Sequence, residues 1–189
     1  YNKLAYTKSP YKLQSNITFK GNISINNNKN IQNGLFEIKD SKNQITISYL
    51  TIENVTFNAP LITISESTVI IKNLKIYNCT FDKSGDSSGK LLDIINSNVI
   101  LDTIDISGGD CLNDSLISYN SKVVNSNPYF GSDISENDFI PKLTIKDMSI
   151  NNVSFGEKGI VFVSGNEIDI SKLNIYNCRG STSPTDSYI

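Results

Sequence analysis

Short runs of alternating apolar and polar residues follow one another along the chain, and one of these runs returns several times. Between Ile45 and Phe57 the apolar residues alternate with Thr, Ser and Glu, and the run ends in the pattern Leu-x-Ile-x-Asn-Val-x-Phe. Alternation with a period of two predicts β-strands that bury one face and expose the other to water. Related runs begin at residues 69, 99, 143 and 168.

The copies share one apolar marker position, which fixes the period of the repeat. The markers lie 24, 30, 44 and 25 residues apart, and they are Ile47, Ile71, Leu101, Ile145 and Ile170. A unit of about two dozen residues that can bury only one face is typical of a solenoid, in which each unit stacks on the next. We therefore expect equivalent strands to pair one repeat apart.

A second apolar run follows each of the first four copies. It occurs at 61–64, 91–94, 116–119 and 160–163, and a similar run at 35–38 implies an earlier repeat with strands at 17–19 and 23–25. The alternation changes phase between Ile47 and Leu50, so a corner belongs there. We expect three short strands per repeat and about six coils in all.

Asparagine follows the pattern apolar-x-Ile-x in four of the five copies. The residues are Asn54, Asn78, Asn152 and Asn177, and Gly108 takes the same place in the remaining copy. Asparagine tolerates the left-handed backbone conformation and bonds to its own turn, and glycine adopts that conformation without steric cost. The pattern predicts a corner at which asparagines stack as a ladder from coil to coil.

These segments carry a resemblance to a known class of proteins. The runs 51–57 and 75–81, ThrIleGluAsnValThrPhe and LysIleTyrAsnCysThrPhe, resemble coils of pectin-lyase-like right-handed parallel β-helix proteins, and the resemblance extends over residues 17–178. It implies an all-β fold, a right-handed parallel β-helix of about six coils with an asparagine ladder. We expect one domain over residues 1–189 that is a fragment of a longer chain, with an insertion loop at 125–141.

Two other folds fit part of the pattern. Leucine-rich repeats also place an asparagine after spaced apolar residues, but theirs comes three residues after the last one, whereas Asn54 follows Ile52 by two. No segment has the sequence of a convex-side helix. A β-sandwich would give many short strands, but it offers no reason for one corner residue to recur at a nearly fixed period.

Composition and charge narrow the classes of partner. The net charge is −2 at pH 7 and no stripe of Lys and Arg follows the chain, so nucleic acid is not an expected partner. Arg179 is the only arginine and histidine is absent, which removes the commonest general base and the commonest metal ligand. We expect no metal, no cofactor and no catalytic residues, and no apolar stretch is long enough for a direct membrane span.

The three cysteines fit the apolar positions of the repeat. Cys79 and Cys178 take the place that Val55 and Val153 hold in other copies, so small buried thiols are expected. Cys111 follows Cys79 by one coil at a position two residues further on. A disulfide between these two is the alternative, and it requires a stagger of two residues.

Six asparagines head Asn-x-Ser/Thr sequons for N-glycosylation. Asn16, Asn22 and Asn113 are the favoured acceptors, because a ladder side chain that turns inward cannot carry a glycan. Asn54, Asn78 and Asn152 coincide with the expected ladder and are the less favoured acceptors.

Polysaccharide chemistry has only partial support in the sequence. The stretch Gly108-Gly109-Asp110-Cys111 resembles the Gly-Asp-Asp-Cys signature of β-helix hydrolases, but one aspartate of the pair is replaced and no histidine exists. Asp93, Asp102, Asp105 and Asp110 are the carboxylates available for hydrolysis or for calcium. Solvated strand and turn residues are the favoured interpretation, and a polysaccharide hydrolase or lyase, degenerate or active, is an alternative.

The expected function is a non-catalytic structural or adhesive module, a surface protein or a filament component, outside the cell or on its surface. Similar coils build large surface proteins of bacteria and protists, and the Asn-, Ile- and Lys-rich composition suits a protist. Expected partners are the rest of the same chain, neighbouring subunits, glycans or a surface protein. In a second alternative, a receptor or recognition module, the insertion binds a partner through Tyr129, Phe130 and Phe139.

Overall fold

The computed structural model describes residues 10–18, 24–25, 30–31, 34–84, 87–111, 115–121, 141–156, 159–164 and 167–180. These residues form β-strands and turns, and no helix occurs among them. Consequently no helix suited to crossing a membrane is found in the described ranges. The expected insertion at 125–141 lies outside the described residues except for Pro141.

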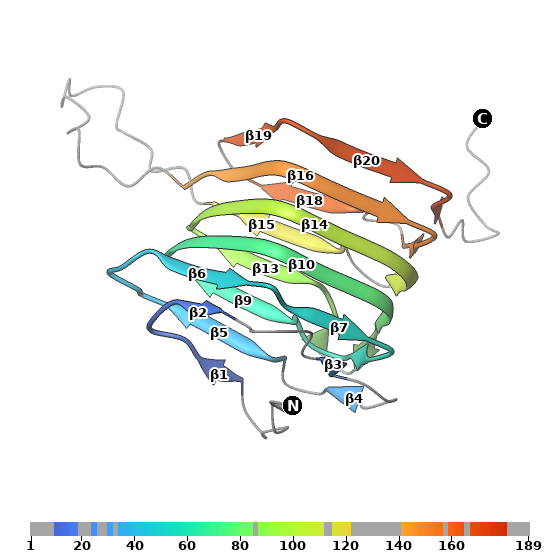
Figure 1. Cartoon of the computed structure of the whole chain (residues 1–189), viewed down its shortest axis with the longest axis horizontal. Helices are drawn as coiled ribbons and strands as arrows, with labels where there is room; N and C mark the ends of the chain where they lie inside the picture. Colours follow the sequence, from blue (N-terminus) through green and yellow to red (C-terminus); the bar gives the residue numbers. More distant parts are fainter. Residues whose placement is uncertain are drawn as a thin grey trace.

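Two parallel sheets make up most of the structure, with their strands stacked in chain order from the N-terminal to the C-terminal end (Figure 1). The six-stranded sheet has the order β1 (Tyr11–Lys12), β5 (Phe36–Lys39), β9 (Ile62–Ser65), β13 (Leu92–Ile95), β15 (Ile117–Asn120) and β18 (Val161–Ser164). Every neighbouring pair in it is parallel and is separated in sequence by strands of the other sheet.

The thirteen-stranded sheet has a central path and several strands beside it. The path runs β19 (Ile168–Ile170), β16 (Leu143–Asn151), β14 (Asn98–Cys111), β10 (Thr68–Phe81), β6 (Ile45–Ser48) and β2 (Ile17–Thr18). Beside it lie β3 (Ser24–Ile25), β4 (Asn30–Ile31), β7 (Thr51–Glu53), β8 (Thr56–Phe57), β17 (Ser154–Phe155), β20 (Leu173–Tyr176) and β21 (Arg179–Gly180). A separate antiparallel pair joins β11 (Lys83–Ser84) to β12 (Ser87–Ser88).

The predicted equivalence of the apolar markers is confirmed by the strand register. Each marker lies opposite the next across a parallel pair, in the order Ile17, Ile47, Ile71, Leu101, Ile145 and Ile170. The second apolar runs pair in the same way through Phe36, Ile62, Leu92, Ile117 and Val161. Successive repeats therefore stack with equivalent residues in contact, as the period of the sequence predicted.

Corners divide each repeat into strand segments. In one repeat the number of these segments differs from the three strands that were expected. Tyr49 has a φ of 62° between β6 and β7, which is the corner predicted there. Asn54 has a φ of 55° and makes a further bend between β7 and β8. With β9, this repeat has four strand segments, because the Asn position bends the chain and does not only flank a strand.

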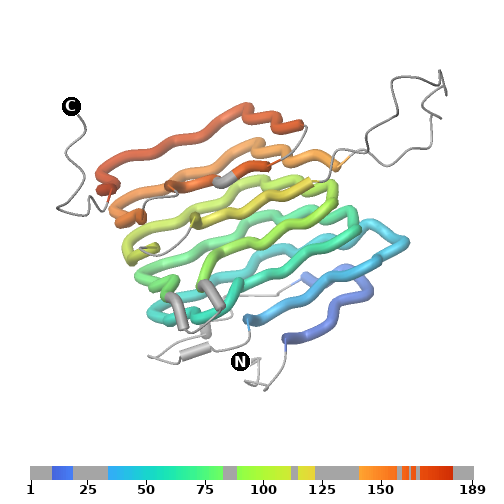
Figure 2. The backbone as a smooth tube through the Cα atoms, turned by 180° about the vertical axis from the view of Figure 1, so that it is seen from behind, coloured from blue at the N-terminus to red at the C-terminus, as the bar shows by residue number. Residues whose placement is uncertain are grey.

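The core lies between the two sheets, whose strands cross it on opposite sides (Figure 2). The inward positions Ile47, Ile71, Leu101 and Ile145 are all 0% exposed. Phe57 and Phe81 occupy equivalent positions one repeat apart, and their rings stack with centroids 5.5 Å apart. Complete burial of one such isoleucine contributes about 1.5–3 kcal/mol, so each repeat is stabilised mainly by covering its neighbour.

A second corner carries a row of serines that the sequence analysis did not identify. The N–H of Ser41 donates to Oγ of Ser67 over 3.0 Å, and the N–H of Ser67 donates to Oγ of Ser97 over 3.2 Å. Each acceptor hydroxyl in turn donates to the carbonyl two residues earlier, Ser67 to Ser65 and Ser97 to Ile95. We call Ser41, Ser67 and Ser97 the serine row.

The backbone just before the serine row explains why serine is suited to this place. Asp40, Glu66 and Asn96 have φ values of 50°, 47° and 46°, so the chain turns sharply there. Ser67 and Ser97 are 1% and 0% exposed, and a backbone N–H at such a turn needs a partner inside the protein. The hydroxyl of the next repeat provides it.

The parallel pairing separates the predicted fold from its alternatives. A β-sandwich is built of antiparallel sheets, so that alternative is wrong for the described residues. A leucine-rich repeat with convex-side helices has no counterpart in the described part of the chain. The structure is all-β, with parallel sheets that are compatible with the expected stacked coils.

The serine row gives a direct test of its contribution to stability. We expect Ser67→Ala to lower the free energy of unfolding by about 1–3 kcal/mol, because it leaves the N–H of Ser41 without its acceptor. Chemical denaturation measures this change. Ser65→Ala is the matched control, since that side chain lies on the outer face of β9, and an equal loss in both variants would contradict the assigned role.

Candidate functional site

The asparagine corner brings together the most regular polar residues of the repeat. Asn54, Asn78, Asn152 and Asn177 have φ values of 55°, 48°, 53° and 54°. These values lie in the left-handed region, which asparagine tolerates better than most residues. The predicted backbone conformation at the four positions is therefore confirmed.

Gly108 replaces asparagine in the middle repeat, and Gly109 follows it, opposite Cys79 of the preceding repeat. Gly108 has a φ of 69°, and a side chain there would overlap Oδ1 of Asn78. Gly109 has a φ of 101°, and a side chain there would overlap the carbonyl of Cys79. The Gly-Gly pair thus fits the backbone of the preceding repeat and is explained without catalytic chemistry.

The sequon asparagines differ from expectation in their exposure. Asn54, Asn78 and Asn152 are exposed, so the inward side chains assumed for the less favoured acceptors are not observed. Asn16 is also exposed, and its Oδ1 accepts a 2.8 Å hydrogen bond from the N–H of Thr46, which leaves its Nδ2 for a glycan. The occupancy of the sequons stays a prediction, and Asn22 and Asn113 lie outside the described residues.

None of the three cysteines forms a disulfide, and Cys79 and Cys178 occupy equivalent places, although Cys178 is only partly buried and not buried as expected. Sγ of Cys79 donates to the carbonyls of Tyr77 and Ile52 over 3.3 and 3.8 Å. Sγ of Cys178, three repeats later in the stack, makes the equivalent two contacts, to Tyr176 and Ile150 over 3.4 and 3.7 Å. Cys111 lies opposite Phe81, while Cys79 lies opposite Gly109, which is the two-residue stagger predicted between them.

Burial controls the chemistry of Cys79. Its side chain is 1% exposed, and this burial raises the pKa of the thiol from 9.0 to about 11. A thiol with a raised pKa is mostly protonated at neutral pH and is a poor nucleophile. Cys79 therefore belongs to the core.

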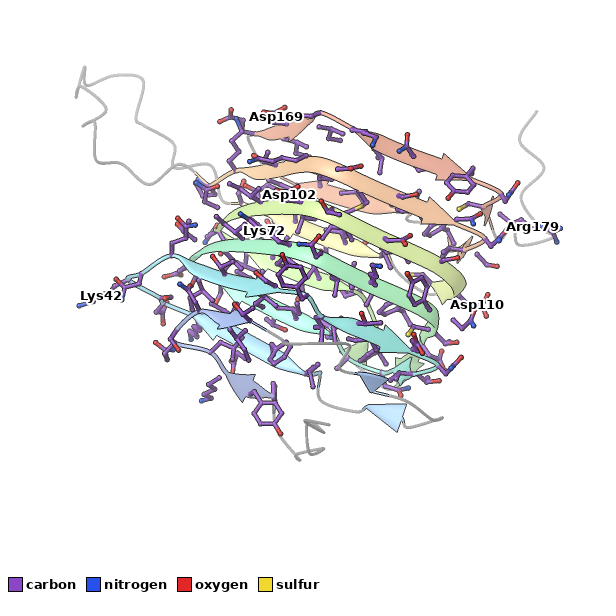
Figure 3. The ribbon with its side chains drawn as sticks, viewed as in Figure 1. Lys42, Lys72, Asp102, Asp110, Asp169 and Arg179 are labelled. Atoms are coloured by element: carbon purple, nitrogen blue, oxygen red, sulfur yellow. The ribbon has the colours of Figure 1, made fainter. Side chains whose placement is uncertain are left out.

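The four candidate aspartates are not brought together. Asp93 lies on β13 in the six-stranded sheet, whereas Asp102, Asp105 and Asp110 follow one another along β14. Asp110 lies near the C-terminal end of that strand, and Asp102 lies in its N-terminal half (Figure 3). Asp110 lies between Thr80 and Ser154 of the neighbouring repeats, and neither is an acidic partner.

A row of charges on the outer face is the one place where two carboxylates face each other across neighbouring described strands. Lys72 lies opposite Asp102, and Asp102 lies opposite Asp147 (Figure 3 labels the first two). Nζ of Lys172 lies 3.2 Å from Oδ1 of Asp147. We call Lys72, Asp102, Asp147 and Lys172 the charged row.

The electrostatics of the charged row are those of an open surface. The side chains of Lys172 and Asp147 are 59% and 39% exposed, and an ion pair with that exposure contributes at most about 1 kcal/mol. Oδ1 of Asp102 accepts a 3.3 Å hydrogen bond from Oγ1 of Thr103. Sequence reasoning singled out Asp102 but not the other three residues. Aligning the position after each marker would have placed Lys72 beside Asp102, but it misses Asp147, because the register shifts by one residue at Asp102.

A tyrosine and an aspartate form a second polar contact on the same face. The hydroxyl of Tyr77 donates to Oδ2 of Asp105 over 3.2 Å. Burial, and then the nearby carboxylate of Asp105, raise the pKa of Tyr77, so the phenol stays a donor at neutral pH. Tyr176 occupies the equivalent outward position at the last repeat and is 48% exposed.

A hollow lies at the C-terminal end of the asparagine corner. It has a volume of about 540 Å³ and is lined by Asn152, Val153, Ser154, Asn177, Cys178 and Arg179. Its walls are two successive corners, one from each of the last two repeats. No group of three Asp, Glu or Cys residues able to hold a metal ion occurs among the described residues. The predicted contact residues Tyr129, Phe130 and Phe139 lie outside them.

Replacement of Asn78 tests the asparagine corner. We expect Asn78→Ala to lower the free energy of unfolding by about 1–2 kcal/mol, because alanine is strained at a φ of 48°. Asn78→Gly should lose less, since glycine has no such strain. The measurement is urea denaturation of protein produced without glycans. Asn174→Ala, at an exposed strand position, is the control, and an equal loss in both Asn78 variants would rule out the conformational explanation.

The raised pKa of Cys79 predicts a pH dependence of stability. Between pH 9 and about 11 the unfolded thiol loses its proton while the native thiol keeps it, so the contribution of Cys79 to stability falls as pH rises through that range. The Cys79→Val variant has valine, the residue found at the equivalent positions Val55 and Val153. It should remove roughly 1–3 kcal/mol of the stability that is lost at alkaline pH. Unfolding measured at pH 7 and pH 10.5 for both proteins tests this, and parallel pH profiles would contradict it.

No family model, no curated protein and no solved structure matches the chain. The function must therefore be argued from the geometry of its own residues. Those residues show a regular stacked surface with one charged row, one asparagine corner and an open C-terminal hollow.

Proposed function

We propose that the chain is a segment of a right-handed parallel β-helix of six coils, similar to those of pectin-lyase-like proteins. Six strands follow one another in each of the two stacking columns, one starting at Tyr11 and the other at Ile17. Crossover connections between parallel strands of one sheet are right-handed in about 98% of cases, which supports the handedness. The protist source suggested by the composition is part of the same proposal.

The asparagine corner acts in this proposal as a ladder that holds successive coils in register. The left-handed backbone shared by Asn54, Asn78, Asn152 and Asn177 supports it. So does the contact between Asn78 and the position of Gly108, which places the asparagine side chain against the next coil. A ladder of this kind fixes register without needing identical residues in the strands.

The function that we propose is a non-catalytic structural or adhesive module, outside the cell or at its surface. The observation that carries it is the parallel pairing of equivalent residues from Ile17 to Ile170, which a register shift at Asp102 interrupts only locally. A stack of that kind gives a stiff rod with a broad, repetitive polar face, which suits spacing and contact between larger structures. The exposed sequon asparagines Asn16, Asn54, Asn78 and Asn152 support an extracellular glycoprotein.

A polysaccharide-cleaving enzyme is the second candidate, and the charged row is the observation that favours it. Asp102 and Asp147 stand opposite each other on neighbouring strands, and glycoside hydrolysis uses a pair of carboxylates. Against it, the ion pair of Asp147 with Lys172 is the ordinary arrangement of a solvated charged surface. The structural module therefore explains more of the chain.

Incubation with polysaccharides separates the two functions. We expect the chain to release no reducing ends and no unsaturated products from pectin, polygalacturonate or related glycans, in assays in which a pectinase serves as the positive control. Turnover that Asp102→Asn, Asp147→Asn or Asp110→Asn abolishes would overturn the proposal. Lys75→Gln, at an exposed position of the same face, is the control for a general effect of lost surface charge.

A further inference from the structure

The pairing between β14 and β16, inside the stack, is the only described strand pairing in which the register shifts. β10 pairs with β14 without a shift along its whole length. Between β14 and β16 the register shifts on both sides of Asp102, so that Asp102 lies opposite Asp147 and Lys146 is passed over. We call this plane between the two repeats the joint.

The shape of the corner changes at the joint. Tyr49, Asn73 and Thr103 hold the second corner position of three successive repeats, with φ values of 62°, 53° and 60°. In the next repeat neither Lys146 nor Asp147 has a positive φ. A left-handed corner therefore meets a corner of another shape, and the backbone groups of the two strands do not meet in the regular order there.

Polar side chains connect the repeats on either side of the joint. On the N-terminal side the hydroxyl of Tyr77 donates to Oδ2 of Asp105 over 3.2 Å and joins β10 to β14. On the C-terminal side Nζ of Lys142, just before β16, lies 2.7 Å from Oε1 of Glu167, just before β19. The last ion pair of the charged row joins the same two repeats. Both neighbouring planes are thus tied by side chains.

Equivalent ties are missing at the joint itself. In the described part of the chain, none of the outward side chains Asp102, Asp105 and Ser107 of β14 bonds to a side chain of β16. Asp102 faces the like charge of Asp147. Oδ1 of Asn151, which lies opposite Ser107, is buried and has no hydrogen-bond partner among the described residues. Like charges directly opposite and an unpaired buried acceptor both weaken strand pairing.

We propose that the stack opens at the joint, so that strands β16–β21 separate from β14 and β15 as one block while β5 to β15 stay paired. We call β16–β21 the C-terminal block. Proteins open locally in cooperative units whose boundaries lie where contacts are weakest, and the joint is such a boundary. The inference rests on the stacked coils of the proposed function. It adds that the rod gives way at one internal plane before the repeats on its N-terminal side unfold.

Two equivalent backbone amides, one plane apart, report on this opening. The N–H of Ile117 donates to the carbonyl of Ile160 across the joint over 3.0 Å. One plane earlier the N–H of Leu92 donates to the carbonyl of Leu116 over 3.3 Å. Leu92 and Ile117 lie opposite each other and both are 0% exposed. Because position and burial are matched, a difference in their hydrogen exchange measures the opening of the joint.

Amide hydrogen exchange, followed residue by residue by NMR, tests the proposal. We expect the N–H of Ile117 to exchange at least about tenfold faster than that of Leu92. The N–H of Val99 bonds across the joint and that of Leu143 bonds within the C-terminal block. These two should exchange within about tenfold of each other, because the detached block has lost its cover. Equal exchange of Ile117 and Leu92 would overturn the proposal. So would exchange of Leu143 far faster than that of Val99, which indicates loss of the last repeat alone.

Removing the like charges should strengthen the joint. We expect Asp102→Asn to slow the exchange of Ile117 by about two- to fivefold and to leave that of Leu92 unchanged. Asp105→Asn is the matched control, because it makes the same change on the same strand opposite Ser149, and it should not slow Ile117. Asp102→Ser replaces Asp102→Asn if the latter does not fold. Equal effects of the Asp102 and Asp105 variants on Ile117 would contradict the proposal.

The outcomes separate the joint from the proposed function. Exchange without a step at the joint, in a chain that cleaves no polysaccharide, removes the joint and leaves the structural module standing. Cleavage of polysaccharides abolished by the aspartate variants removes the structural function, and it does so whatever the pattern of exchange.

Discussion

Parallel, in-register pairing between successive repeats is the interaction on which the rest of the structure depends. Among the described residues, the strands of the two parallel sheets pair only with strands of neighbouring repeats, so a single repeat is not stable alone. Pairing with the next repeat satisfies the backbone and, in the same step, covers the inward isoleucines. The apolar columns and the corner residues are both consequences of this one arrangement.

Corners show how strongly the stack constrains local conformation. Asn54, Asn78 and Gly108 suit a left-handed backbone, but Tyr49 and Thr103 adopt it too, with φ values of 62° and 60°. That conformation costs about 1–2 kcal/mol for an ordinary residue, and more crowding is expected for β-branched threonine. Burial of two or three isoleucines per repeat outweighs this cost. The stack therefore holds a corner even where the local residue does not favour it.

The columns could be predicted from the sequence because strand alternation and a fixed corner residue together define which positions are equivalent. Ile47, Ile71 and Leu101 were matched in this way, and the insertion before Ile145 did not obscure the match. The serine row and the charged row could not be predicted with the same ease. They depend on which polar residues meet across repeats, and composition says little about polar positions that vary from copy to copy.

The exposure of the asparagine side chains at the asparagine corner could not be predicted from the sequence either. The backbone conformation of Asn78 follows from its residue type, but the position of its Oδ1 close to Gly108 of the next repeat does not. Asn16 illustrates the same limit, because its bond to the N–H of Thr46 joins residues from different repeats. A single repeat contains no information about such contacts.

The register between β14 and β16 shows where the length of such a chain can change. Leu101 and Ile145 lie opposite each other although the connection between them is much longer than the one between Ile47 and Ile71. The entropic cost of a longer connection grows only slowly with its length. Extra sequence is thus tolerated wherever it leaves the stack at a corner, and the scaffold can gain or lose an appended segment there while its strands keep their partners.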